Sequence, residues 1–152
     1  MIRFVQEGNS FDFKNDSAAD ISAGMPIIRG KLHGISKRTV KVGEVGAAHK
    51  DKEAIFEIQV PVNDDGVNQT IFAPGEEVYL DANNSGVAHK GPVDTDNGIY
   101  YLGVAVPAIG ISRDEAGGIA ANDGAANASA AFVRFVVRQS NNDQGTPPWL
   151  ES

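Results

Sequence analysis

The stretch Ala54-Ile55-Phe56-Glu57-Ile58-Gln59-Val60-Pro61-Val62 decides the fold class, because apolar and polar side chains alternate along it. Ile58, Val60 and Val62 recur at every second position, which is the period of a half-buried β-strand. The same alternation appears in residues 11–13, whereas helical spacing is hard to find anywhere in the chain. The sequence therefore predicts an all-β protein.

Turn residues divide the rest of the chain into further short strands. Asp64-Asp65-Gly66, Ala73-Pro74-Gly75 and Asp96-Asn97-Gly98 are typical turn sequences. The strands that we expect between such turns are near residues 3–6, 11–14, 26–29, 32–36, 39–45, 54–61, 69–73, 77–81, 86–89, 99–106 and 131–138. So many closely spaced strands favour a small β-barrel or a sandwich.

Two segments depart from this pattern. Residues 107–130 form a long connection rich in Ala, Gly, Asn and Asp, and a connection of this length usually binds something or orders against a neighbour. After the β-rich domain, which we place at residues 1–138, the polar and proline-rich residues 139–152 are expected to form an extended tail. Trp149, the single tryptophan, either packs on its own domain or anchors a neighbouring subunit.

Composition excludes several classes of partner. The formal net charge of −7 and the pI near 4.8 argue against direct nucleic-acid binding, which needs clustered Lys and Arg. The one basic cluster, Lys37, Arg38 and Lys41, reads as a solvated hairpin end. No apolar run approaches the length of a membrane span, and the residues after Met1 read as a strand, so cytosolic synthesis is expected. The absence of cysteine fits a reducing compartment.

Motifs for nucleotides and for calcium are incomplete. Residues 24–31 resemble a phosphate-binding loop, but five residues separate the glycines instead of four, and Leu32 stands where a hydroxyl is needed. Residues 81–86 have the alternating oxygen ligands of the first half of a calcium loop, but Pro92 occupies the position of the required glutamate. We therefore expect no cofactor and no metal.

No catalytic constellation is evident either. His33, His49 and His89 are dispersed and lack the short spacing of zinc ligands. Asp94 and Asp96 lie in a turn without an apolar pocket that would raise one pKa. We expect a protein that is not an enzyme and has no catalytic residues, while a hydrolase acting through these aspartates or a histidine remains an alternative.

A second alternative is a carbohydrate- or ligand-binding β-module. Its aromatic platform would use Tyr100, Tyr101 and Trp149. The competing interpretation is that Tyr100 and Leu102 face the core, because they alternate along a strand, while Tyr101 lines a subunit contact.

The order of short phrases along residues 4–138 resembles the capsid decoration, or cement, proteins of tailed bacteriophages. The opening Phe4-Val5-Gln6-Glu7-Gly8 is similar to that family's first strand, and Pro74-Gly75-Glu76-Glu77-Val78-Tyr79-Leu80-Asp81 to its Gly-Asp-Xaa-Val-Tyr-Trp-Asp strand. The other similar phrases are residues 11–13, 21–28, 32–36, 43–46, 54–58, 102–105 and 133–135. The tail at 139–152 has no counterpart in the family pattern.

The resemblance implies an all-β, single-domain barrel, β-tulip-like fold or sandwich with a long Ala/Gly/Asn loop and an extended C-terminal tail. It implies a virion protein that binds the exterior of the mature capsid, stabilises contacts between major capsid proteins and is synthesised in the bacterial host cytoplasm. By analogy a homotrimer is favoured, with a dimer as the alternative. The contact residues that we expect are Phe4, Val5, Gln6, Glu7, Ile109, Ile111 and Trp149.

Overall fold

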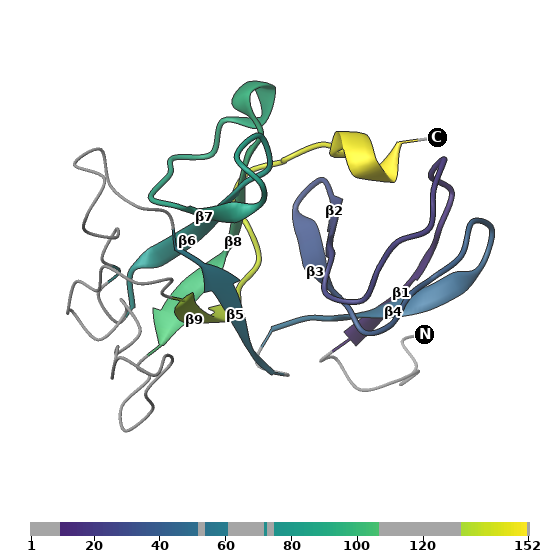
Figure 1. Cartoon of the computed structure of the whole chain (residues 1–152), viewed down its shortest axis with the longest axis horizontal. Helices are drawn as coiled ribbons and strands as arrows, with labels where there is room; N and C mark the ends of the chain where they lie inside the picture. Colours follow the sequence, from purple (N-terminus) through teal and green to yellow (C-terminus); the bar gives the residue numbers. More distant parts are fainter. Residues whose placement is uncertain (1–9, 52–53, 61–71, 73–74, 107–131, 152) are drawn as a thin grey trace, which may run out of the picture.

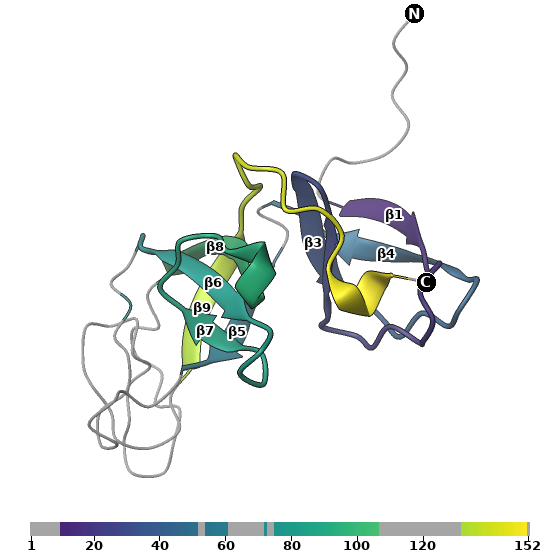
Figure 2. The same cartoon turned by 90° about the horizontal axis from the view of Figure 1, so that it is seen from above.

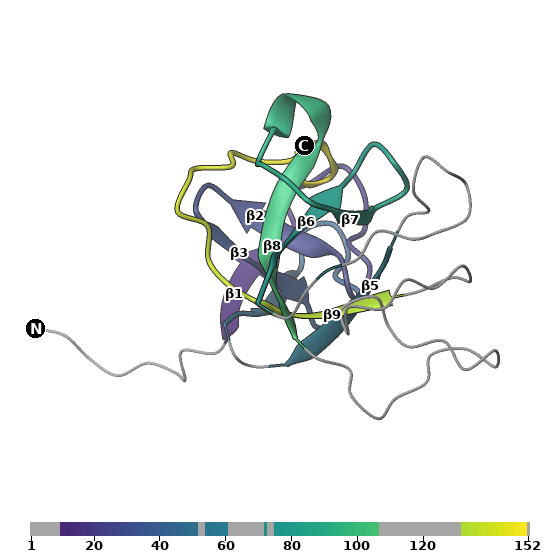
Figure 3. The same cartoon turned by 90° about the vertical axis from the view of Figure 1, so that its left-hand side faces the viewer.

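The computed structural model describes residues 10–51, 54–60, 72, 75–106 and 132–151, and within them the chain folds into two antiparallel sheets (Figure 1). The first sheet is built from the N-terminal third of the chain and the second from the remainder. Viewed from the left-hand side of Figure 1, the second sheet lies in front of the first (Figure 3). Among the described residues, no helix is long and apolar enough to cross a membrane.

The first sheet has the strand order β1-β4-β3-β2. Its strands are β1 (Ser10–Lys14), β2 (Pro26–Arg29), β3 (Leu32–Ser36) and β4 (Val45–His49). β2 and β3 form a tight hairpin, in which Arg29 is paired with Leu32 and Pro26 with Ile35. Ile27 and Ile28 are both buried. They face opposite sides of this sheet, because side chains alternate along a strand.

The second sheet has the strand order β5-β9-β8-β6-β7. Its strands are β5 (Ile55–Gln59), β6 (Glu77–Asp81), β7 (Val87–His89), β8 (Ile99–Val106) and β9 (Phe132–Val137). The sheet curls, so that its edge strands β5 and β7 come into contact, but the described strands do not close it into a barrel. Two short 3-10 helices, η1 (Thr95–Asn97) and η3 (Pro148–Leu150), complete the described elements.

The buried apolar side chains form two clusters, one for each sheet. The cluster of the second sheet consists of Ile35, Val60, Phe72, Val78, Leu80, Ala88, Leu102, Ala105, Val133, Phe135 and Val137. The cluster of the first sheet consists of Phe13, Ile21, Ile27, Val40, Ala48 and Leu150. The cluster of the second sheet includes Ile35 from β3 of the first sheet. Trp149 packs against both clusters, so the two cores are in contact.

The all-β, single-domain prediction is confirmed, and most of the expected strands are present. The strand expected at 39–45 is wrong: Val40 makes only an isolated bridge to Ile21, and the next strand begins at Val45. The reason is a turn, in which the backbone N–H of Glu44 donates to the carbonyl oxygen of Lys41 and Gly43 adopts a φ of +84°. The strand expected at 3–6 lies outside the described residues, as does the one at 69–73 except for Phe72.

Candidate contact surfaces and the pocket between the sheets

Residues 139–151, here called the C-terminal strap, run from the end of β9 across to the first sheet (Figures 1 and 2). The strap includes η3 and ends with the carbonyl oxygen of Glu151 accepting a hydrogen bond from the backbone N–H of Ala18. Its side chains and backbone make hydrogen bonds to both sheets. Three groups of contacts join the strap to the sheets.

The first strap contact is made by the amide of Gln139. Its Oε1 accepts from the backbone N–H of His33 at 3.0 Å, and its Nε2 donates to the carbonyl oxygen of His33 at 2.8 Å. Nε2 also donates to Oδ1 of Asp51 at 3.1 Å. One side chain thus takes the place of a neighbouring strand beside β3 and satisfies two backbone groups that would otherwise be unpaired.

The second strap contact lies at Gln144 and Gly145. The backbone N–H of Gly30 donates to the carbonyl oxygen of Gly145, and the backbone N–H of Gln144 donates to the carbonyl oxygen of Gly30, both at 2.9 Å. The buried side-chain Oε1 of Gln144 accepts from the backbone N–H of Tyr101 at 2.6 Å. Gln144 therefore contacts β8 of the second sheet and the β2–β3 turn of the first sheet at the same time.

The third strap contact is the indole of Trp149. Its Nε1 donates to the carbonyl oxygen of Pro26 at 2.9 Å, and its ring meets Tyr100 edge to face with the centroids 5.3 Å apart. Trp149 packs against both apolar clusters, and the next residue, Leu150, is buried in the cluster of the first sheet. The half-buried tryptophan thus lies where the two cores meet.

His33 also joins the two sheets directly. Its Nε2 lies 2.7 Å from the carbonyl oxygen of Leu102 on β8, and its ring meets Tyr101 edge to face at 5.9 Å. Burial lowers the pKa of His33, and this effect outweighs the hydrogen bond to Leu102 and the charge of Asp51, which both act to raise it. The imidazole is therefore neutral at pH 7 and acts as a hydrogen-bond donor to Leu102.

Tyr101 and Tyr79 continue the row of rings that begins at His33. The two tyrosine rings lie 5.4 Å apart, and the hydroxyl of Tyr79 donates to Oε2 of Glu77 at 2.6 Å. Burial, reinforced by this hydrogen bond, raises the pKa of Tyr79 to about 12. Burial also raises the pKa of Tyr101, so both hydroxyls are protonated at neutral pH.

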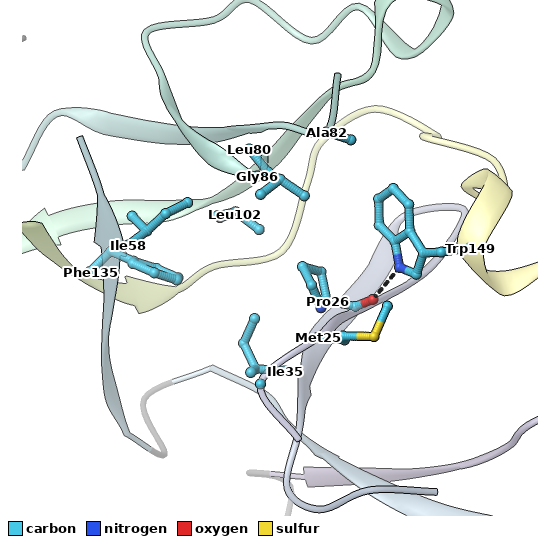
Figure 4. Close-up of a pocket in the computed structure, with 11 residues that line it drawn as sticks. Met25, Pro26, Ile35, Ile58, Leu80, Ala82, Gly86, Leu102, Phe135 and Trp149 are labelled. Atoms are coloured by element: carbon cyan, nitrogen blue, oxygen red, sulfur yellow. Dashed lines mark hydrogen bonds between the residues drawn. The ribbon is translucent and has the colours of Figure 1, made fainter. Parts of the chain in front are cut away.

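An apolar pocket of about 350 Å³ opens between the sheets next to Trp149 (Figure 4). Met25, Pro26 and Ile35 form its wall on the first sheet. Leu80, Leu102 and Phe135 are among the residues that form its wall on the second sheet. Its volume lies at the lower end of the range of small-ligand pockets, about 300–1,000 Å³. The pocket has the size and the lining to receive one or two apolar side chains.

The comparisons with known proteins decide the family. The model of the phage cement protein family matches residues 5–135, which include the first sheet and the second sheet except for the end of β9. The chain belongs to the phage cement protein family. No curated protein and no solved structure matches it significantly.

Membership of the phage cement protein family makes the chain a structural protein of a bacteriophage capsid. The matched region ends within β9, before the C-terminal strap. Trp149 and the two strap glutamines therefore lie outside the part of the chain that the family model describes.

Of the contact residues expected from the sequence, the structure places only Trp149. Residues 4–7, Ile109 and Ile111 lie outside the described residues. The sequence alone did not indicate the other residues that join the sheets beside Trp149. These are Pro26, His33, Gln139 and Gln144. No motif marks them, because each contacts a residue that is remote in the sequence.

Exposed apolar side chains mark further candidate contact surfaces of this cement-family protein. Val42 and Val45 are 53% and 57% exposed at one end of the first sheet, and Ile55 is 60% exposed on β5. β5 lies at an edge of the second sheet among the described strands. An edge strand can pair with another chain, so the exposed Ile55 on β5 marks a candidate contact at this edge.

The structure does not assemble the platform of a ligand-binding module from the three aromatic residues expected for one. Tyr100 is only 3% exposed and meets Trp149 at an interplanar angle of 79°, so the two rings share no flat surface. Tyr101 follows Tyr100 on the same strand and faces the opposite side, towards His33. The aromatic platform expected for this alternative is therefore absent from the arrangement of these three residues.

The polar turns at Asp81 and Asp94, whose sequences resemble a calcium loop and a carboxylate pair, have structural roles. Oδ1 of Asp81 accepts from the backbone N–H of Asn83 at 3.1 Å, and Oδ2 of Asp94 accepts from Nδ2 of Asn97 at 2.7 Å. Within the described part of the chain, no group of three His, Cys, Asp or Glu residues is placed to hold a metal ion.

Proposed function

We propose that this cement-family protein binds the exterior of the mature capsid as a symmetric oligomer, with a trimer favoured, and stabilises contacts between major capsid proteins. The observation that carries the proposal is the family match, which spans residues 5–135 and so includes both sheets except for the end of β9. The proposed contact residues are those expected from the sequence, Phe4, Val5, Gln6, Glu7, Ile109, Ile111 and Trp149. The exposed Val42, Val45 and Ile55 are added to them.

The area of one protomer is sufficient for both kinds of contact. A chain of this mass has an accessible surface of about 7,400 Å², and a stable interface takes about 800 Å² of it per partner. An oligomer that holds several capsid proteins at once gains apparent affinity by about 10²–10⁴ without strong individual contacts. Small apolar surfaces such as the one at Ile55 are therefore sufficient anchors.

The stabilising effect follows from differential binding. A protein that binds the expanded shell more tightly than the precursor shell shifts the equilibrium towards the expanded one by the ratio of the two affinities. The hydrogen bonds that tie the C-terminal strap to both sheets support this role, because parts of a protein that are already held in place lose less conformational entropy on binding.

The test is light scattering after size exclusion, on the purified protein alone and mixed with expanded DNA-free capsids of its own phage. We expect a discrete trimer that co-migrates with the capsids and binds precursor shells more weakly. A protein that stays unbound at capsid-saturating concentrations contradicts the proposal.

A matched pair of variants on β5 examines one of the contact surfaces. Ile55→Lys removes an exposed apolar side chain and adds a charge, while Gln59→Lys adds the same charge at an exposed position on the same face. If Ile55 lies in a contact, only the first variant weakens assembly or capsid binding. Equal behaviour of the two variants removes Ile55 from the contact surface.

A further inference from the structure

The pocket between the sheets has apolar walls and no occupant among the described residues. Pro26 and Ile35 line it from the first sheet, Leu102 and Phe135 line it from the second, and Trp149 lies at its side (Figure 4). Water in such a pocket finds few hydrogen-bonding partners, so an apolar side chain that displaces it lowers the free energy.

Residues 1–9, here called the N-terminal arm, carry side chains that suit this pocket. Their sequence is Met-Ile-Arg-Phe-Val-Gln-Glu-Gly-Asn, with three large apolar residues at Ile2, Phe4 and Val5. The arm joins the described structure at Ser10, the first residue of β1. Phe4 precedes Ser10 by six residues, which gives it a reach of about 20 Å.

The register of the first sheet gives the direction of β1 at Ser10, where the described structure begins. Ser10 and Ile35 are both paired with His49, from opposite sides of β4, so β1 and β3 run parallel. The direction of β1, extended backwards beyond Ser10, leads towards the level of Gly34 and His33 and away from the end of the sheet where Ile35 and Pro26 line the pocket. To enter the pocket of its own chain, the arm would have to reverse and cross β4 and β3. The pocket of a neighbouring copy needs no such reversal.

We propose that the N-terminal arm of one copy docks into the pocket between the sheets of a second copy, with Phe4 as the main anchor. The proposal rests on the symmetric oligomer of the proposed function and names the contact that would build it. An arm-in-pocket contact joins two different surfaces, and such head-to-tail contacts close into rings when the rotation between neighbours allows. A buried aromatic side chain in a fitting pocket is a typical anchor of a protein interface.

Disulfide crosslinking provides a direct test, because the chain contains no cysteine. Two single variants are mixed under oxidising conditions, Phe4→Cys and an affinity-tagged Ala82→Cys, where Ala82 lines the pocket. We expect a covalent heterodimer on non-reducing gels. The control replaces Ala82→Cys by Val42→Cys, which puts the thiol on an exposed surface away from the pocket lining.

The crosslinking results distinguish an arm that docks into a second copy from an arm that fills the pocket of its own chain. A heterodimer that forms with Ala82→Cys but not with Val42→Cys supports the exchange of arms. In the double variant Phe4→Cys/Ala82→Cys, a disulfide within one chain without crosslinked oligomers means that the arm fills its own pocket, and this overturns the proposal. Equal or absent crosslinking with both partners overturns it too.

A second measurement removes the anchor without adding a thiol. Phe4→Asp is expected to shift the midpoint concentration of oligomer assembly upwards by about tenfold or more, as for the loss of one buried aromatic side chain, whereas Phe4→Leu keeps most of the assembly. Circular dichroism checks that both variants fold. Assembly by Phe4→Asp at the wild-type concentration contradicts the proposal.

Capsid binding is measured separately on the same variants. Pocket-specific crosslinks in a protein that does not bind capsids would leave the arm contact in place and reject the capsid function. Capsid binding by an oligomer without pocket-specific crosslinks would reject the arm contact alone.

Discussion

Nε2 of His33 on β3 lies 2.7 Å from the carbonyl oxygen of Leu102 on β8 and so links the two sheets directly. A neutral imidazole makes this contact with the proton on Nε2. Its other nitrogen, Nδ1, is buried and has no hydrogen-bond partner among the described residues. A second proton on the ring would therefore be buried without an acceptor, and this makes the link between the sheets sensitive to pH.

We predict that the protein loses stability on mild acidification through His33. Burial holds the pKa of His33 below its ordinary value of 6.5, so the unfolded chain takes up the proton more readily than the folded one. The contribution of this residue is complete above pH 6.5 and falls as the pH drops below it, by up to about 1.4 kcal/mol per pH unit.

Urea unfolding between pH 7.5 and pH 5 measures this dependence. His33→Gln keeps a hydrogen-bond donor but cannot titrate in this range, so its stability should depend less on pH than that of the wild type. Equal pH dependence in the two proteins would assign the acid sensitivity to other groups.

We predict that the side chain of Trp149 holds the sheets together by more than its hydrogen bond. Trp149→Phe removes the donor to Pro26 and should cost about 1 kcal/mol. Trp149→Ala also removes the packing against both clusters and should cost about 2–4 kcal/mol, somewhat less than for a fully buried tryptophan.

The matched control is Thr146→Ala, an exposed position in the same strap, which should stay within about 0.5 kcal/mol of the wild type. Unfolding has to be followed by circular dichroism, because Trp149 is the single tryptophan of the chain and its replacement removes the tryptophan fluorescence signal. A cost for Trp149→Ala as small as that of the control would mean that the strap does not fix the sheets.

The sequence was sufficient to predict strands whose apolar pattern is bounded by clear turns. β2, β3, β6 and β8 begin and end where the pattern of β-branched and aromatic residues predicted them. The segment 39–45 was mistaken for a strand because Val40 and Val42 match the pattern, while the turn at Lys41 to Glu44 overrides it. Local turn chemistry is stronger than alternation over so few residues.

The contacts between the sheets could not be predicted in the same way. Trp149 was recognised as a candidate because it is a lone aromatic residue after two prolines, but its partner Pro26 is 123 positions away. Gln139 and Gln144 lie in a segment that reads as a polar spacer. The Gln139 amide nevertheless pairs with two backbone groups of His33, and Oε1 of Gln144 accepts from the backbone N–H of Tyr101. Such pairs depend on the packing of the sheets and have no local signature.

We predict that Gln139→Ala loosens β3 locally. The variant leaves the N–H and the carbonyl of His33 without their partner, at a cost of about 1–3 kcal/mol. The exposed Gln59 on β5 provides the control, since Gln59→Ala should be close to neutral.

Amide hydrogen exchange tests the position of this effect. The His33 amide should exchange faster in Gln139→Ala, beyond the change expected from the loss of global stability. Unchanged protection of this amide would mean that water replaces the glutamine without cost.

The last prediction concerns the close approach of β8 and β9 at Gly103. A Cβ atom at this position would collide with the backbone carbonyl group of Val136, and a rigid backbone cannot yield as the end of a side chain can. Gly103→Ala should therefore push the two strands apart and cost about 3 kcal/mol or more, comparable with an overpacked core. Val104→Ala, at a half-buried position on the same strand, is the control, with an expected cost of about 1 kcal/mol. The midpoint of urea unfolding measures both, and a Gly103→Ala protein as stable as Val104→Ala would show that the pairing of β8 and β9 is looser than its register indicates.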